Sequence, residues 1–88
     1  MGLTNTTIQK ASRIKETVYT YFEESNDQSI QAKELMPLFI KKGLFNSNHR
    51  DGSPIRNLLR LLDKEGQLAL IPQVHFEQKS VNKNWFFI

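Results

Sequence analysis

The chain has 88 residues, of which 39% are hydrophobic and 24% are charged. These proportions are typical of a globular protein, and the length suffices for one domain with one modest core. The sequence contains no cysteine, which excludes disulfides, iron–sulfur clusters and thiolate zinc sites. It shows no apolar run near the roughly 20 residues that span a bilayer and no secretory signal. We therefore expect one cytoplasmic domain over residues 1–88 that does not contact a membrane, with residues 1–6 disordered.

The net charge of +3 is unevenly distributed along the chain. Residues 1–40 carry four Lys or Arg against five Asp or Glu, whereas residues 41–88 carry eight against four. The first segment therefore has a net charge of −1 and the second a net charge of +4. An excess of positive charge in one half of a protein favours an anionic partner at that half.

The N-terminal half shows two stretches with helical periodicity. Apolar residues recur every three or four positions from Thr7 to Glu24, which predicts a long amphipathic helix. A second helical pattern covers Gln31–Lys42 and ends at Gly43. Pro37 removes a hydrogen bond inside this pattern, so we expect a kink or two short helices. Ile30 is a candidate for a short additional strand. We expect the aromatic side chains of both stretches to lie in the core: Tyr19, Tyr21, Phe22 and Phe39.

A third helix is predicted by its own start and stop signals. Ser53 suits the N-cap, Pro54 suits the first helical position, and Gly66 suits a left-handed residue after the last turn. At about 100° per residue, Ile55 and the leucines fall on one side of this helix. The opposite side carries three cations at four-residue spacing and one amide side chain: Arg56, Asn57, Arg60 and Lys64. The sequence therefore predicts an amphipathic helix with one cationic face.

The hydrophobic pattern after the third helix has a period of two, which predicts strands. The first strand runs from Leu68 to Phe76, and Pro72 inside it favours an edge position or a bulge. A polar turn follows and carries Lys79 and Lys83. Trp85–Ile88 is the final strand, in which we expect two side chains to cover the helices and two to face outward.

The order helix, helix, helix, hairpin predicts a mainly helical α+β fold, with a three-helix core followed by a C-terminal β-hairpin. In this order the chain resembles the winged-helix domains, in which a hairpin called the wing follows the recognition helix of a helix-turn-helix. The resemblance covers Thr7–Ile88 and is architectural: Gln31–Lys42 matches the second helix, Pro54–Lys64 the recognition helix and Phe76–Trp85 the wing. It implies DNA binding, with the third helix in the major groove and the wing on a neighbouring groove or the backbone. The connection from Gly43 to Gly52 is longer than the turn of a simple helix-turn-helix.

The cationic side chains suit such a role. Arginine makes forked contacts to guanine or phosphate, asparagine can bond adenine, and lysine contacts phosphate. The free N–H groups at the start of the third helix also favour an anion; His49, just upstream, we interpret as a loop residue. For each of these residues the alternative is a structural role, such as a solvated helix face, helix capping or hairpin solubility. The expected nucleic-acid-binding residues are Arg50, Ser53, Arg56, Asn57, Arg60, Lys64, Lys79 and Lys83.

Catalysis finds little support in the sequence. The two histidines, His49 and His75, lack metal-ligand spacing, and no glycine-rich phosphate loop or nucleophile motif is present. We therefore expect no enzyme activity, no metal, no cofactor and no small-molecule substrate.

The expected function is binding of double-stranded DNA by a homodimer, as a small transcriptional regulator. The alternative is a winged-helix protein–protein interaction module that uses the apolar outward side of Trp85–Ile88. Binding of RNA or single strands is less favoured, because no exposed aromatic platform is identified.

Overall fold

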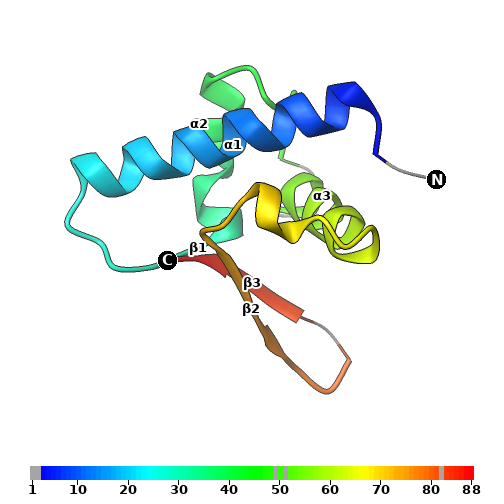
Figure 1. The fold of residues 1–88 in the computed structure, drawn as a ribbon. Helices are drawn as coiled ribbons and strands as arrows, with labels where there is room; N and C mark the ends of the chain where they lie inside the picture. Colours follow the sequence, from blue (N-terminus) through cyan, green and yellow to red (C-terminus); the bar gives the residue numbers. More distant parts are fainter. Residues whose placement is uncertain (1–2, 49, 51, 82) are drawn as a thin grey trace.

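The computed structural model describes residues 3–48, 50, 52–81 and 83–88. Over these residues the protein is α+β and mainly helical, with a three-stranded antiparallel sheet whose two longer strands end the chain. Figure 1 shows α1 lying across the other helices and the β2–β3 hairpin extending away from the helical body. The elements are α1 (Asn5–Glu24), β1 (Ile30–Gln31), the 3-10 helix η1 (Ala32–Leu35), α2 (Met36–Lys41), α3 (Ser53–Lys64), the 3-10 helix η2 (Leu68–Leu70), β2 (Val74–Gln78) and β3 (Lys83–Phe87).

The first turn of α1 forms earlier in the chain than predicted because Thr4 caps it. Its Oγ1 accepts a hydrogen bond of 3.1 Å from the backbone N–H of Thr7, which satisfies one of the unpaired donors of the first turn. This start lies inside the stretch 1–6, for which the sequence predicts disorder. Leu3 also packs against the core. The prediction of disorder is therefore wrong for the described part of this stretch, and residues 1 and 2 lie outside it.

The second predicted helix is divided into two short helices, as Pro37 indicated. The chain forms η1 first, and Pro37 then lies in the first turn of α2, where its missing N–H leaves no hydrogen bond unmade. Gln31 is not helical, because it belongs to β1. The predicted additional strand is confirmed: Ile30 pairs with Phe87, and Gln31 pairs with Phe86. This pairing places η1 beside β3 and α3.

The predicted strand over 68–76 is wrong in its first half. The backbone N–H groups of Leu70 and Ile71 donate to carbonyls three residues back, at 3.1 and 3.0 Å, and so form the η2 turn. Ile71, which follows this turn, is completely buried. In an extended strand, Ile71 would lie on the opposite face from Leu70. β2 begins at Val74, after Pro72, which has no N–H to donate to a sheet.

The sheet has the strand order β1–β3–β2, so β3 is its central strand. The predicted alternation along β3 is confirmed. Trp85 and Phe87 are 3% and 0% exposed and cover the helices, whereas Ile88 is 55% exposed and Phe86 is half-buried. Phe76 on β2 pairs with Trp85, and their ring centroids are 5.2 Å apart.

The core lies between the helices and the inner face of the sheet. Phe39 is at its centre, and the rings of Phe45 and Phe87 meet it edge-on at centroid distances of 6.1 and 6.3 Å, a favoured aromatic geometry. The predicted core position of Tyr19 is wrong, because its side chain is 60% exposed. Within the described residues, no helix combines the length and the apolar character needed to cross a membrane. The buried hydrophobic side chains are Ala11, Ile14, Val18, Ala32, Leu35, Met36, Phe39, Leu44, Ile55, Leu59, Leu62, Ile71, Trp85 and Phe87.

The turn between α1 and β1 is closed by a tyrosine. The hydroxyl of Tyr21 donates a hydrogen bond to Oδ2 of Asp27. This hydrogen bond is the main cause that raises the pKa of Tyr21 above its usual value of 10.0, with smaller contributions from desolvation and from the negative charge of Asp27. All three effects favour the protonated phenol over the phenolate.

Substitution of Asp27 by Asn is expected to lower the pKa of Tyr21, because it removes the carboxylate that accepts the phenol proton. The measurement is an absorbance titration of tyrosinate in a Y19F background, since the chain has two tyrosines. The folded-state pKa lies above the unfolded one, so the stabilisation is fully present below the unfolded pKa and is lost as pH rises through the folded pKa. Identical titration curves with and without Asp27 would show that the contact is absent in solution.

Candidate nucleic-acid interface

Packing determines which side of α3 faces the solvent. Ile55, Leu59 and Leu62 have no exposed surface, and burial of each such side chain contributes about 1.5–3 kcal/mol. Leu61, at the edge of the apolar side, is 39% exposed. The polar side chains lie away from the core: Arg56 is half-buried, and Asn57, Arg60 and Lys64 are exposed. The two faces predicted for this helix are therefore present.

The start of α3 differs from the prediction, because Gly52 and not Ser53 is the N-cap. Gly52 has a left-handed φ of +98°, and its N–H donates to Oδ1 of Asn48 at 2.6 Å. This conformation, which favours glycine, turns the chain into the helix one residue earlier than a serine cap would. The Ser53 hydroxyl instead accepts a 3.5 Å hydrogen bond from Nδ2 of Asn57. At the other end, Gly66 has the predicted left-handed conformation, with φ +70°.

Gly52 also brings α3 into close contact with η1. A Cβ atom at this position would lie 2.4 Å from Cβ of Lys33 and 3.2 Å from a terminal nitrogen of Arg56. No side chain fits there without displacing a neighbour. The absence of a side chain at Gly52 therefore allows Lys33 and Arg56 to lie on adjoining walls of one surface.

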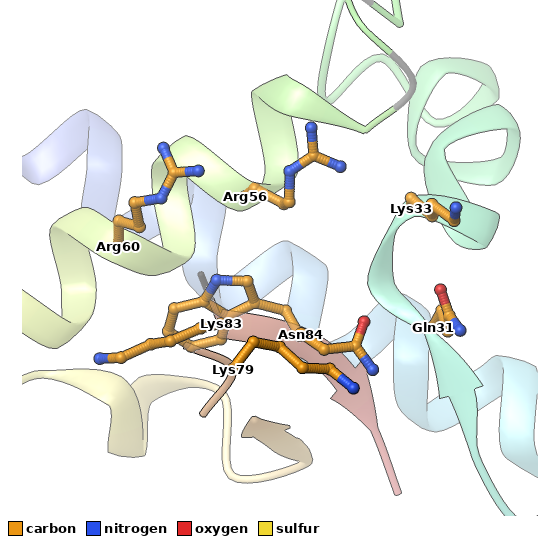
Figure 2. A pocket seen from close by; sticks show the side chains of 8 residues that line it. Gln31, Lys33, Arg56, Arg60, Lys79, Lys83 and Asn84 are labelled. Carbon is orange, nitrogen blue, oxygen red and sulfur yellow. The ribbon is translucent and has the colours of Figure 1, made fainter. Parts of the chain in front are cut away.

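A groove of about 380 Å³ opens between α3, η1 and the β2–β3 hairpin. Figure 2 shows Arg56 and Arg60 extending from α3, with Lys79 and Lys83 below them and Lys33 on η1 to one side. None of the described residues that line the groove is acidic. Its lining residues are Gln31, Lys33, Arg56, Arg60, Lys79, Lys83, Asn84 and Trp85. Five positive side chains around one hollow create a surface that attracts anions.

The two arginines of the groove are oriented by neighbouring polar groups. Arg56 donates a hydrogen bond of 3.2 Å from its guanidinium to the backbone carbonyl of Arg50, which has a left-handed φ of +50°. Arg60 donates to Oδ1 of Asn57 at 2.9 Å. No described carboxylate forms an ion pair with Arg60. Arg50 and Asn57 therefore each orient one of these arginines. Arg50 does so through its backbone carbonyl, and Asn57 through its side-chain oxygen.

The two hairpin lysines have different environments. Lys83 is the first residue of β3, and its Nζ lies 2.5 Å from Oδ2 of Asp63 on α3 and 4.4 Å from the ring centroid of Phe76. Its predicted position in the turn is wrong, because it pairs with Gln78 in the sheet. Its side chain joins the hairpin to α3. Lys79 lies in the turn, and its Nζ is 3.7 Å from Oε1 of Glu77. Both of these side chains are well exposed, so this pair contributes under about 1 kcal/mol and leaves Lys79 accessible to an anion.

Among the described residues of the groove lining, Trp85 is the one that is aromatic. Its side chain is almost fully buried, and its Nε1 has no hydrogen-bond partner. Buried indole N–H groups normally find an acceptor, and an unsatisfied buried donor costs about 1–3 kcal/mol. The sequence analysis considered this residue only as part of the apolar strand Trp85–Ile88, because the polar atom of an indole carries no pattern that indicates a site.

The structure thus brings together four of the eight predicted residues: Arg56, Arg60, Lys79 and Lys83. It leaves the other four outside the groove lining: Arg50, Ser53, Asn57 and Lys64. It adds four residues that sequence reasoning missed: Gln31, Lys33, Asn84 and Trp85. Lys33 gave no signal because it lies in the half of the chain with net negative charge. His49 lies outside the described residues.

Comparison of the chain with family models, curated proteins and solved structures found no match. Within the described part of the chain, no three His, Asp or Glu side chains are grouped to hold a metal ion. The chemistry that the groove offers is hydrogen-bond donation and positive charge, which suit an anionic oxygen ligand.

Substitution of Gly52 by Ala is expected to destabilise the protein by about 2–4 kcal/mol, from the left-handed backbone conformation and the steric clash with Lys33. Gly43→Ala is the matched control. Gly43 also has a positive φ, +77°, but nothing lies within 4 Å of its added Cβ, so only the conformational term of about 1–2 kcal/mol applies. Urea unfolding of both variants gives the comparison. Equal losses would contradict the close approach of α3 and η1.

Proposed function

We propose that this chain is a winged-helix protein that binds double-stranded DNA, as a small transcriptional regulator. In this proposal α3 lies in the major groove and the β2–β3 hairpin contacts the backbone. The observation that carries it is the set of five cationic side chains from three separate elements around one groove with no described acidic residue in the lining. A polyanion with closely spaced phosphates is the ligand that such a surface binds best.

The exposed side of α3 supports the major-groove placement. Asn57, Arg60 and Lys64 are all exposed along this helix. Arg60 lies on this side and also lines the groove, so it is within reach of both a base edge and the backbone. The Asn57 side chain accepts from its guanidinium, which reduces the conformational entropy that Arg60 loses on binding. An arginine held in this way can make a bidentate contact to guanine.

The hairpin supports the backbone contact. It follows α3 in the chain and extends from the helical body (Figure 1). The ion pair between Lys83 and Asp63 joins the hairpin to α3, so the two elements present their cations in a defined relative position. Lys79, with a side chain that is 60% exposed, lies at the start of the turn, where it reaches a phosphate beside the one that α3 contacts.

Substitution of Arg60 by Gln tests the proposal. Fluorescence anisotropy with a labelled duplex is measured between about 50 and 200 mM salt, and the logarithm of affinity should fall linearly with the logarithm of salt concentration. Loss of one phosphate contact is expected to reduce that slope by about 0.9. Lys15→Gln is the charge-matched control, because Lys15 is an exposed residue of α1 outside the groove lining.

Two results would contradict the proposal. One is the absence of any binding to duplex DNA at the lowest salt concentration. The other is an equal effect of the Arg60 and Lys15 substitutions, which would show that only the total charge matters and not the position of the cation.

Substitution of Asp63 by Asn is expected to strengthen DNA binding. Asp63 neutralises Lys83 in the free protein, so its removal leaves an additional positive charge beside the groove. The slope of affinity against salt should become steeper by about 0.9 if Lys83 then contacts a phosphate. Weaker binding by this variant, with its folding verified by circular dichroism, would show that Lys83 acts only by fixing the hairpin.

The alternative function is docking of a protein on the outward side of β3. Ile88 is 55% exposed there, and the half-buried Phe86 stacks on His75 with ring centroids 5.9 Å apart. The same surface is where we propose that a second copy of the chain binds in a homodimer. This alternative becomes the leading one if duplex DNA does not bind at low salt.

A further inference from the structure

The groove contains a hydrogen-bond donor that nothing in the described chain satisfies. Trp85 is the only tryptophan of the protein. Its side chain is 3% exposed, and its Nε1 is buried without an acceptor. The residue nevertheless lines the cationic groove. An acceptor for this N–H must therefore come from outside the described chain.

The cations of the groove cannot be that acceptor. Arginine and lysine side chains carry only donors, so Arg56, Arg60 and Lys83 cannot satisfy the indole. The lining also holds the side-chain amides of Gln31 and Asn84, and neither accepts from Trp85. The acceptor that this environment selects is therefore an oxygen with negative charge, which satisfies the indole and several cations at once.

The position of the indole is well defined. Trp85 pairs across the sheet with Phe76, whose ring is tilted by 52° against it, and Nζ of Lys83 lies 5.6 Å from the indole ring centroid. The walls are more adaptable. Nε1 itself is buried, so a side chain of the groove must shift for an oxygen to reach it. Arg60, which is exposed, is one of these wall side chains.

We propose that this groove is a discrete binding site for one phosphoryl group, in which the Trp85 indole N–H donates to one non-bridging oxygen while Arg56 and Arg60 contact the other. The inference rests on the proposed function, because the phosphoryl group is assigned to the DNA backbone. It adds a neutral, directional contact to the charged ones. Such a contact fixes the register of the protein on the duplex and not only its overall affinity.

The test uses two readouts of the same residue. Trp85→Phe keeps an aromatic ring and removes the N–H. Binding of labelled duplex DNA is expected to weaken about tenfold, with an unchanged salt slope because no charge is lost. Arg60→Gln is the comparison, since it reduces the slope.

The second readout is the single indole N–H cross-peak of the unmodified protein labelled with ¹⁵N. This cross-peak is expected to move downfield on addition of duplex DNA. The measurement does not depend on the folding of the variant.

Inorganic phosphate is the second probe, and it separates the sources of the phosphoryl group. A cross-peak that moves with DNA supports the proposal. DNA binding without movement of the cross-peak, and with normal affinity of the Trp85→Phe variant, overturns this inference and leaves the proposed function intact. Movement with inorganic phosphate in the absence of DNA binding overturns the assignment to the DNA backbone, together with the proposed function. Absence of DNA binding, together with a cross-peak that does not move with inorganic phosphate, overturns both.

Discussion

The burial of one face of α3 is the constraint on which the candidate site depends. Ile55, Leu59 and Leu62 are completely buried, and together their burial is worth several kcal/mol. This contact fixes the rotation of α3 about its own axis. Arg56 then faces the groove and Arg60 lies at its rim, because both are on the side of the helix that the core leaves uncovered. A rotation of α3 that hid the arginines would expose the leucines.

The relative position of α3, η1 and the hairpin depends on two short contacts. Gly52 permits η1 to approach the start of α3 so closely that Lys33 joins the same surface. The Lys83–Asp63 ion pair holds the hairpin against the other end of the helix. This pair is about one-third exposed, so its contribution to stability is modest, but it defines where Lys79 lies. Positive charge is thus concentrated by packing and not by a run of basic residues, and Asp63 neutralises one of the lysines.

The local elements could be predicted where a residue's own chemistry dictates the backbone. Gly66 ends α3, Pro37 divides the second helix, and the alternation along β3 hides Trp85 and Phe87. The predictions failed where a contact between different elements determines the backbone conformation. Ser53 is a good N-cap by type, but Gly52 takes that place because η1 and Asn48 hold it. The segment before Pro72 has a strand-like pattern, yet burial of Ile71 is achieved by a 3-10 turn instead.

The sequence by itself determined the α+β composition, the amphipathic character of α3 and the row of cations at four-residue spacing, because these follow from periodicity within one element. Only the tertiary structure decided that Lys33 and Trp85 join Arg56 and Arg60, that Lys83 is neutralised, and that an indole N–H is left without an acceptor beside five cations. The physical reason is that a binding surface is assembled from elements distant in the chain. Their juxtaposition is set by the packing of apolar side chains, and no pattern among the polar residues themselves encodes it.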